Sequence, residues 1–332
     1  MKLRYWLIAG TLLVLFCGWS SLQSSARWRT VQATGECTAR SECALAVAGE
    51  KLYLMGGRRV QGVDVYDPLS STWAIGAEAP IEMHHFQAVT YDDKVYVMGA
   101  LTGAYPREDP VPVIYIYDPM EDRWMVGDSI PAHRRRGAAG VAVVGDKIYL
   151  ACGIQDGHYD GHVTWLDRYD PKTGAWEELA DAPRARDHFQ LAAVGDQLFI
   201  AGGRTSSAKT GHVFDLTISE VDVYDIGTGQ WRSHISDIPT QRAGCTSVTF
   251  GQQFVVIGGE SASIEEGHYE AEVFDPVTNG WYSSHPLIDG RHGMQAVLFD
   301  DNIYLAAGAG NRGGGPELTS IEVISASGLF SR

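Results

Sequence analysis

The sequence predicts an all-β protein in which six consecutive four-stranded units close into a ring. One observation is a segment in which an aromatic residue and Asp are followed by a polar turn and a Trp, as in residues 66–73. This segment occurs five times, and its Trp residues are 51, 52, 55 and 50 positions apart. Another is a short apolar run ending in small residues, which occurs six times. A period near 50 residues is typical of repeat proteins whose units stack on one another.

These two features define four strands in each unit, called a, b, c and d in chain order. The apolar run is strand b, and it follows a polar turn and a second apolar segment, strand a, which together indicate a hairpin. The aromatic residue lies on strand c and the Trp on strand d. The b runs are residues 52–57, 95–100, 148–153, 198–203, 254–259 and 303–308. The c and d pairs are Tyr66 and Trp73, Tyr117 and Trp124, Tyr169 and Trp176, Tyr224 and Trp231, and Phe274 and Trp281.

The repeat resembles the kelch repeat in four features: the apolar strand b, its terminal glycine doublet, the aromatic residue of strand c and the Trp of strand d. The resemblance covers residues 28 to about 325, with departures at Gly99-Ala100, Cys152-Gly153 and Ala307-Gly308. It implies a six-bladed β-propeller, a radial array of four-stranded sheets. Blocks such as residues 184–192 also look like those of exported bacterial kelch proteins, which are often called galactose-oxidase-like.

The two ends of the chain are predicted to close the ring. An isolated four-stranded sheet leaves an apolar face uncovered, so successive units must stack to bury a continuous core. The sixth unit has no Trp on strand d, because the position seven residues after Ile324 is Ser331. Trp28 precedes Arg40 by 12 residues, which matches the spacing from Trp to the next unit elsewhere. We expect an N-terminal strand at Trp28 to complete blade six; the alternative is that Trp28 is an aromatic residue of a loop.

Residues 1–26 are predicted to form a leader before a propeller of residues 27–332. Two basic residues precede an apolar segment, residues 7–19, that is shorter than the roughly 20 residues of an ordinary membrane span. Small residues up to Ala26 suit a signal peptidase. The prediction is a cleaved secretory signal peptide, with an uncleaved N-terminal anchor or a lipoprotein attached at Cys17 as alternatives. The protein is therefore expected in the periplasm, at the cell surface or outside the cell.

The remaining cysteines follow from this expectation of export. Export permits disulfides, and Cys37 and Cys43 are close enough in sequence to pair. A Cys37 to Cys43 disulfide is one possibility and two free thiols are the other. Cys152 and Cys245 lie on predicted strands and are expected to be small buried residues.

The charge of the chain argues against two classes of partner. The formal net charge is −15 at pH 7. A strongly acidic protein is repelled by nucleic acid and by anionic membrane surfaces. We therefore expect no nucleic-acid partner, and membrane contact only through an uncleaved N-terminal segment. The protein is also expected to be a monomer.

The upper face, defined here as the face carrying the d-to-a and b-to-c loops, is the expected location of a binding site, because loops on a rigid scaffold often carry function. Twelve residues before strand b, five of six units have Arg, and the next two positions add His. On the innermost strand these side chains would surround the channel, where Arg can bind anionic groups bidentately. The alternative is that each Arg caps carbonyls or pairs with a carboxylate. The candidate ligand-binding residues are Arg40, His85, Arg136, Arg186, His188, Arg242, Arg291 and His292, with Tyr159, Phe214 and Tyr269 as stacking surfaces.

A Gly-His pair occurs four times in the b-to-c loops, with its imidazoles at His158, His162, His212 and His268. Imidazoles and nearby carboxylates can converge on a metal, but no spacing matches a short ligand motif. The prediction is therefore solvated loop histidines, with no metal and no cofactor.

The sequence has none of the short motifs of common catalytic sites: GxSxG, HExxH, a phosphate loop or CxxC.

The function predicted from these observations is non-catalytic. The protein is expected to bind a protein, peptide or glycan, with anionic groups favoured by the arginines, through the upper face. The alternative is an enzyme acting on a sugar, for example a sialic-acid mutarotase, because the kelch family includes an exported propeller with that activity. Copper oxidase chemistry is not expected, because no Cys and Tyr pair suited to a copper site is identifiable.

Overall fold

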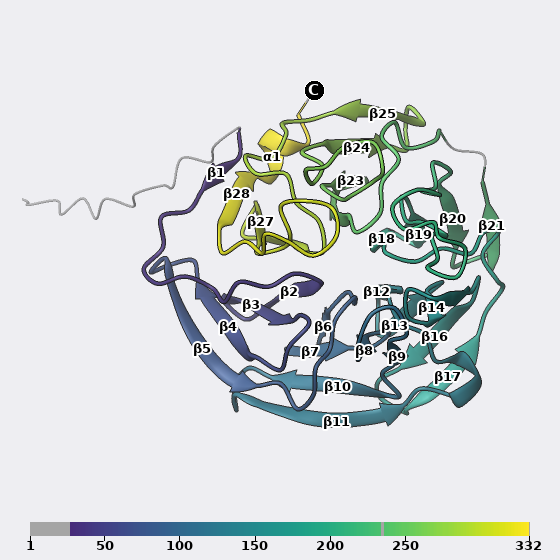
Figure 1. Ribbon diagram of the computed structural model, residues 1–332, viewed down its shortest axis with the longest axis horizontal. Helices are drawn as coiled ribbons and strands as arrows, with labels where there is room; N and C mark the ends of the chain where they lie inside the picture. Colours follow the sequence, from purple (N-terminus) through teal and green to yellow (C-terminus); the bar gives the residue numbers. More distant parts are fainter. Residues whose placement is uncertain (1–26, 234–235, 332) are drawn as a thin grey trace, which may run out of the picture.

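The computed structural model describes residues 27–233 and 236–331 and shows six four-stranded sheets around a central axis (Figure 1). Each sheet is one blade, and the chain passes through the blades in sequence order. The predicted six-bladed propeller is confirmed. The predicted leader, residues 1–26, lies outside the described residues.

The strands of the six blades have the following bounds. Blade one consists of β2 (Cys43–Ala48), β3 (Lys51–Gly56), β4 (Gly62–Asp67) and β5 (Thr72–Glu78), and blade two of β6 (Val89–Tyr91), β7 (Lys94–Val97), β10 (Val113–Asp118) and β11 (Arg123–Ser129). Blade three consists of β12 (Gly140–Val144), β13 (Lys147–Ala151), β16 (Leu166–Asp170) and β17 (Ala175–Glu178), and blade four of β18 (Leu191–Val194), β19 (Gln197–Ile200), β20 (Asp222–Asp225) and β21 (Gln230–Arg232). Blade five consists of β22 (Thr246–Phe250), β23 (Gln253–Ile257), β24 (Ala271–Asp275) and β25 (Gly280–Ser283), and blade six of β26 (Ala296–Phe299), β27 (Asn302–Ala306), β28 (Ile321–Ser325) and β1 (Arg29–Thr30).

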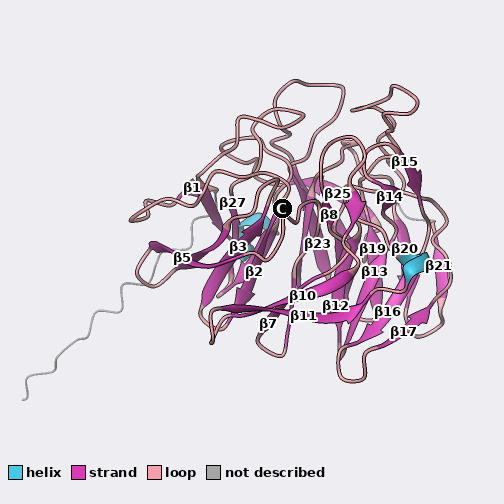
Figure 2. Ribbon diagram, turned by 60° about the horizontal axis from the view of Figure 1, so that its bottom comes forward, coloured by secondary structure: helices cyan, strands magenta, loops and turns pink. Residues whose placement is uncertain are grey.

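The b-to-c loops are long in blades two to six and contain two short hairpins. They gather at one face of the ring, at the top of Figure 2. The hairpins are β8 (Leu101–Thr102) with β9 (Asp109–Pro110), and β14 (Ile154–Asp156) with β15 (Asp160–His162). The helical elements are a 3-10 turn at Ala132–Arg134 and α1 (Ala326–Leu329). Within the described part of the chain, no helix has the length and apolar character needed to cross a bilayer.

The recurring aromatic residue and Trp pair directly across strands c and d in five blades. In blade one, Tyr66 is the cross-strand partner of Trp73, and the ring centroids lie 5.0 Å apart. Blade three repeats the pair with Tyr169 and Trp176 at 4.8 Å. Facing aromatic pairs stabilise antiparallel sheets, so the register of the outer strands follows from the spacing seen in the sequence.

Ring closure through the N-terminus is also confirmed. Strand β1 pairs antiparallel with β28, so the purple and yellow ends of the chain lie side by side in Figure 1. Trp28 is only 6% exposed and packs in one core cluster with Leu329 and Phe330. Its indole N–H donates to the carbonyl of His285 at 3.0 Å. Trp28 is therefore a core residue of the closing blade and not a loop aromatic.

A ring of six residues joins the blades around the channel. Each lies two positions after the recurring Arg position and has a positive φ between 50° and 62°. In blades two to six the N–H of this residue donates to the carbonyl of its equivalent in the preceding blade, and in blade one the N–H of the next residue, Cys43, closes the circle on the carbonyl of Gly293. The six residues, called the φ ring, are Glu42, His85, Ala138, His188, Gly244 and Gly293. Since most non-glycine residues avoid positive φ, this closed set of hydrogen bonds must hold the backbone in place.

Three buried glutamines close the channel beneath the φ ring. The side-chain N–H of Gln87 donates to the carbonyl of Leu191, and that of Gln190 to the carbonyl of Met294. Gln295 completes the triangle by bonding both backbone groups of Ala88. The glutamines connect blades two, four and six, so the upper end of the channel has a floor.

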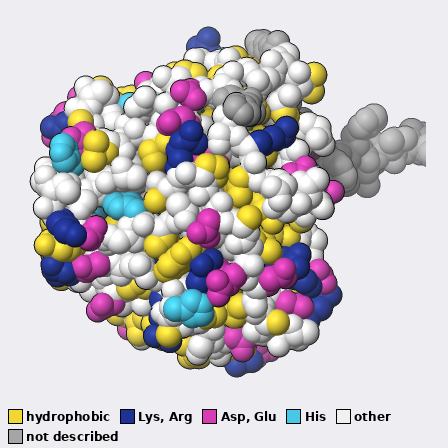
Figure 3. Space-filling view, turned by 90° about the vertical axis from the view of Figure 1, so that its right-hand side faces the viewer, with side chains coloured by type: hydrophobic (Ala, Val, Ile, Leu, Met, Phe, Trp, Pro, Cys, Tyr) yellow, Lys and Arg dark blue, Asp and Glu magenta, His cyan; other side chains and the backbone are white. Residues whose placement is uncertain are grey.

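The charged side chains on the rim of the propeller are mixed in sign. On the side seen in Figure 3, Lys and Arg side chains lie among Asp and Glu side chains. Exposed pairs include Lys172 with Asp146 and Arg168 with Glu177. The described residues on this side of the rim therefore carry both signs of charge and form no uniform basic surface.

Replacing Trp28 by Ala is expected to lower the free energy of unfolding by about 3 to 5 kcal/mol, because a buried aromatic side chain is lost. Trp28→Phe keeps most of the apolar contact and loses the indole hydrogen bond, so it should cost about 1 kcal/mol. Urea denaturation followed by circular dichroism measures both values. A Trp28→Ala protein as stable as the wild type would contradict closure through β1.

Candidate functional site

The five recurring arginines lie inside the blades and not at the mouth of the channel. Each is 0% exposed and forms an ion pair with a carboxylate two residues before the aromatic position of strand c. The pairs are Arg40 with Asp64, Arg136 with Asp167, Arg186 with Asp222, Arg242 with Glu272, and Arg291 with Glu322. The structure thus corrects the expectation that these guanidinium groups are presented to a ligand, and it favours the structural alternative.

The remaining hydrogen bonds of the guanidinium groups go to backbone carbonyls, except that Arg291 also donates to the hydroxyl of Ser320 at 3.0 Å. Arg136 donates to the carbonyls of Arg134, Leu150 and Cys152 at 2.8 to 2.9 Å. Buried charges are tolerated only when paired and hydrogen-bonded. The arginine therefore fixes the path of the d-to-a loop against strands b and c of its own blade.

The disulfide considered between Cys37 and Cys43 is not formed. Both thiols are free and buried. The Cys37 thiol donates to the carbonyl of Thr319 at 3.2 Å, and the Cys43 sulfur lies 3.7 Å from the carbonyl oxygen of Gly293. Burial raises the pKa of each thiol to about 12. Cys152 and Cys245 are also free and buried, as expected.

A pocket opens on the upper face above the φ ring. Its volume is about 350 Å³. Blades one, two and four contribute most of its walls, and the lining residues are Ser41, Glu42, Arg58, His85, Tyr105, His158, Arg204, Val213, Phe214, Glu260, Gly313 and Gly314. Within the φ ring the cavity narrows to about 40 Å³. The pocket is therefore a bowl with a polar floor.

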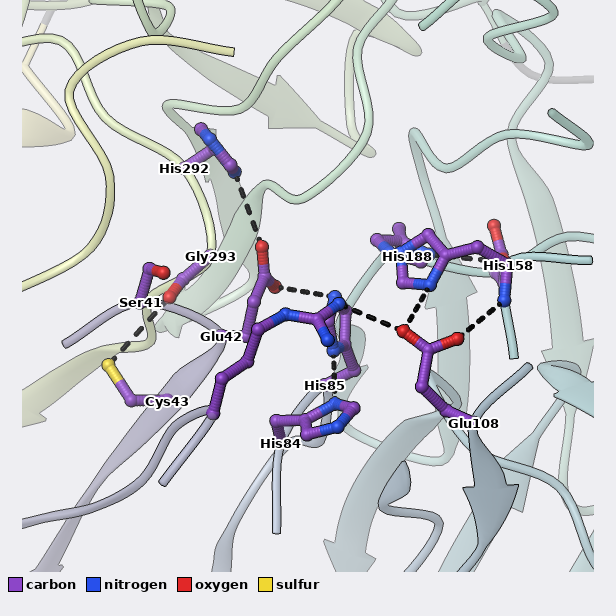
Figure 4. A network of polar contacts seen from close by, with 12 residues as sticks. Ser41, Glu42, Cys43, His84, His85, Glu108, His158, His188, His292 and Gly293 are labelled. Carbon is purple, nitrogen blue, oxygen red and sulfur yellow. Dashed lines mark hydrogen bonds and ion pairs between the residues drawn. The ribbon is translucent and has the colours of Figure 1, made fainter. Parts of the chain in front are cut away.

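Three imidazoles meet at the floor of this pocket. The ring centroids of His85, His158 and His188 are each 4.8 Å from the other two. The Nε2 atoms of His158 and His188 are 3.1 Å apart. Figure 4 shows these two rings facing one another, with His85 nearby. His85 and His188 come from the φ ring, whereas His158 comes from the tip of the β14 and β15 hairpin.

Each of the three imidazoles has a carboxylate beside it. The Nδ1 atom of His158 is 2.9 Å from Oε1 of Glu108, and the backbone N–H of His158 donates to Oε2 of the same group at 2.9 Å. Oδ2 of Asp187 lies 3.1 Å from Nδ1 of His188. Oε2 of Glu42 lies 3.2 Å from Nε2 of His85. Glu108 orients the His158 ring through its hydrogen bonds and leaves Nε2 of that ring facing the centre, whereas Asp187 lies beside His188 without a hydrogen bond to its Nδ1.

Two glycines create the space for these carboxylates. At Gly157, which has a φ of 51°, an added Cβ would lie 2.0 Å from Oε2 of Glu108. At Gly293 an added Cβ would lie 2.9 Å from the carboxyl carbon of Glu42. Both contacts are too short for any other residue. The Gly-His sequence therefore places His158 against Glu108.

Burial keeps the two histidines of the φ ring neutral. It lowers the pKa of His85 well below its usual value, and the neighbouring imidazoles, His84 first, act in the same direction. Burial also lowers the pKa of His188, with the charge of Arg204 as the next cause. The pKa of Glu108 lies below its usual range: burial opposes this, but hydrogen bonds from His158 and Arg58 outweigh it.

A second polar group lies on the opposite wall. Arg204 and Glu260 form a buried ion pair at 2.7 Å, and the N–H of Gly313 donates to Glu260 at 2.8 Å. The pKa of Glu260 falls to about 2; burial acts against this shift, and the charges of His292 and Arg204 outweigh it. Two carboxylates, Glu42 and Glu260, and two guanidinium groups, Arg58 and Arg204, line the pocket. Two further carboxylates, Glu108 and Asp187, lie behind the histidines. This balance favours a cationic group over the anionic ligand expected from the sequence.

The remaining candidate residues from the sequence differ in whether they are buried, line the pocket or are exposed. His292 is buried at the edge of the site, with Nε2 2.9 Å from the carbonyl oxygen of Asn311. Phe214 lines the pocket, and Tyr269 is 41% exposed on the upper face. Tyr159 is covered by the guanidinium group of Arg107 at 3.4 Å. Of the Gly-His imidazoles, only His212 is well exposed; those of His158, His162 and His268 are 12% exposed or less, contrary to the expectation of solvated side chains.

Sequence reasoning missed several residues of the pocket. Arg58, Arg204 and Glu260 each directly follow the glycine doublet of strand b. That recurring position was a usable signal, because the residue after strand b enters the upper face. Glu108 has no equivalent in the repeat and only its contact with His158 identifies it.

Comparisons with known proteins agree with the fold. The family model described as Attractin/LZTR1 beta-propeller matches residues 20–268. The chain is 29% identical over 287 residues to Kelch-like protein terF of Aspergillus terreus, covering 81% of this chain and 61% of that protein. It is 28% identical over 255 residues to Kelch-like protein 25 of Xenopus tropicalis, covering 74% and 40%. The chain thus spans less than two thirds of the length of these relatives. The solved structure of YjhT covers 87% of this chain and 95% of its own at a TM-score of 0.73 and 14% identity, which shows the fold alone.

Replacing Arg242 by Met is expected to lower the free energy of unfolding by about 3 to 5 kcal/mol, because Glu272 is left buried without its partner. Lys172→Met is the matched control, since Lys172 forms an exposed pair with Asp146 at 3.1 Å. It should cost less than about 1 kcal/mol. Urea denaturation measures the difference, and equal losses would show that the buried pair has no special structural role.

Replacing Glu260 by Gln tests the ion pair with Arg204 through its pH dependence. Because the folded-state pKa of Glu260 is about 2, below the ordinary value of 4.5, its contribution is complete above pH 4.5 and is lost as the pH falls towards 2. We expect Glu260→Gln to be less stable than the wild type by about 3 kcal/mol at pH 7. The two unfolding free energies should converge on acidification. A difference that does not change between pH 7 and pH 3 would contradict this assignment.

Proposed function

Because the chain belongs to the Attractin/LZTR1 beta-propeller family, we propose that it is a non-catalytic binding module that recognises a protein through its upper face. The kelch-like relatives support a protein as the class of partner. The observation that carries the proposal is the bowl above the φ ring, which is open to a side chain of a partner. The glutamine triangle beneath it prevents a segment from passing through the channel.

The surroundings of the bowl suit a peptide segment with a basic side chain. Carboxylates outnumber guanidinium groups around the pocket, which favours insertion of Lys or Arg. Large apolar side chains on the upper-face loops offer contacts to the flanking residues of such a segment. They are 41% to 52% exposed and comprise Val60, Tyr105, Leu216, Tyr269 and Ile288.

Export is part of the same proposal. It rests on the basic, apolar and small-residue pattern of residues 1–26 in the sequence. The proposed partner is therefore a protein of the cell envelope or of the extracellular space.

A displayed library of random peptides tests the proposed binding face. We expect peptides selected on the wild type to be enriched in Lys or Arg and to lose binding when Gly314 is replaced by Trp. Gly314 lines the pocket, and an added Cβ there meets no atom within 4 Å, so the Trp fills the bowl without backbone strain. The matched control is Gly227→Trp, on a turn between strands c and d at the lower face, where the nearest atom lies 3.5 Å away.

Two outcomes would contradict the proposal. One is binding that survives Gly314→Trp and is lost in Gly227→Trp, which would place the partner on the lower face. The other is faster anomeric exchange of a reducing sugar in the presence of the protein, observed by NMR, which would support the sugar-acting alternative.

A further inference from the structure

We propose that His85, His158 and His188 bind one divalent transition-metal ion, best matched by Zn²⁺, at the floor of the upper pocket. The inference goes beyond protein recognition and does not depend on it. The candidate ligand atoms of the three histidines all lie within 4.8 Å of one another. Imidazole nitrogen is a ligand that zinc, copper, iron and nickel share.

The spacing of the nitrogens fits a tetrahedral centre. Zn–N bonds of about 2.0 to 2.1 Å in tetrahedral geometry place the ligand nitrogens roughly 3.3 Å apart. The Nε2 atoms of His158 and His188 are 3.1 Å apart. The ligand nitrogen of His85 lies within 4.8 Å of the other two. Its Nδ1 is 2.6 Å from Nδ1 of His84 and its Nε2 is 3.2 Å from Oε2 of Glu42, so one of these two contacts must give way for His85 to become the third ligand.

The carboxylates around the imidazoles match the outer shell of a metal site. Histidine ligands of zinc usually donate their other ring N–H to a carboxylate or carbonyl. Glu108 occupies this position at Nδ1 of His158, whereas Asp187 lies 3.1 Å from Nδ1 of His188 without a hydrogen bond to it. The Nε2 atoms of the two rings face one another at 3.1 Å. Glu42 lies beside His85 and adds a third negative charge to balance the ion.

The scaffold holds the ligands in place before a metal arrives. His85 and His188 are fixed at positive φ by the hydrogen bonds of the φ ring. His158 is fixed by two hydrogen bonds to Glu108, whose place is kept open by Gly157.

Within the described residues, the three histidines form the cluster that meets the geometry of a metal site, and they leave a fourth position for another donor. Zinc sites with three protein ligands and an open position bind water or a ligand there. Since His85 and His158 also line the upper pocket, the open position is directed into that pocket.

The metal alone is the probe in the test. Tag-free full-length protein is stripped with a chelator and titrated with Zn²⁺ by calorimetry and with Co²⁺ by visible absorption. We expect one ion per chain and an intense absorption typical of tetrahedral Co²⁺. His158→Ala and His188→Ala should lose stoichiometric binding, and Glu108→Gln should weaken it by about 10- to 100-fold. The control is His212→Ala, the exposed member of the Gly-His set, which should bind as the wild type does.

A second measurement keeps the test decisive if a histidine variant does not fold. Saturating Zn²⁺ should raise the melting temperature of the wild type, because an ion that binds the folded chain stabilises it. The proposal is overturned if the wild type binds no stoichiometric Zn²⁺ and its melting temperature is unchanged, or if His158→Ala binds as tightly as the wild type. In that case the contact between His158 and His188 is an ordinary hydrogen bond. Failure of the peptide experiment would not affect these readouts, because they contain no partner.

Discussion

The buried pair of arginine and carboxylate in each blade is the interaction on which the upper face depends. A guanidinium group removed from water must satisfy its charge and its five N–H groups inside the protein. Arg186 pairs with Asp222 and donates to the carbonyls of Gly202 and Glu220, while its Nε–H is left without a hydrogen-bond partner. Its position ties the d-to-a loop to strands b and c. The residue two positions later, His188, lies just before strand a (β18) at positive φ and joins the φ ring.

In blade two, both members of the arginine and carboxylate pair are replaced together. There the arginine position is Met83, and the carboxylate position, two residues before the aromatic Tyr117, is Tyr115. Met83 is buried in a core cluster against which Tyr115 packs. Replacing both members of a buried ion pair by apolar groups can preserve stability, whereas removing one leaves a charge unpaired. The φ ring passes through blade two unchanged at His85, so an apolar contact can support the same backbone path.

The fold could be predicted from the sequence because the spacing of the recurring residues determines the length of the repeat, the register of the outer strands and the closure of the ring. The interval of seven residues between Tyr66 and Trp73 is the interval of a cross-strand pair, and the missing Trp after Ile324 indicated the need for β1. The site was harder to predict. The recurring arginines identified the correct loop but not their own burial, because that depends on an acidic residue on another strand. His158 and Glu108 meet through two loops of adjacent blades, and no repeat spacing fixes the conformation of those loops.

The placement of the pocket follows from the sizes of the side chains on the φ ring. Ala138, Gly244 and Gly293 contribute little volume, whereas Glu42, His85 and His188 reach into the centre. Because Gly293 has no Cβ, the carboxylate of Glu42 can lie between His85 and His292, as Figure 4 shows. The ring is rigid and supplies fixed imidazoles, and the loops above it supply the remaining donors. A change in the β14 and β15 hairpin would therefore alter what the pocket binds while the blades, held by their own ion pairs, keep their arrangement.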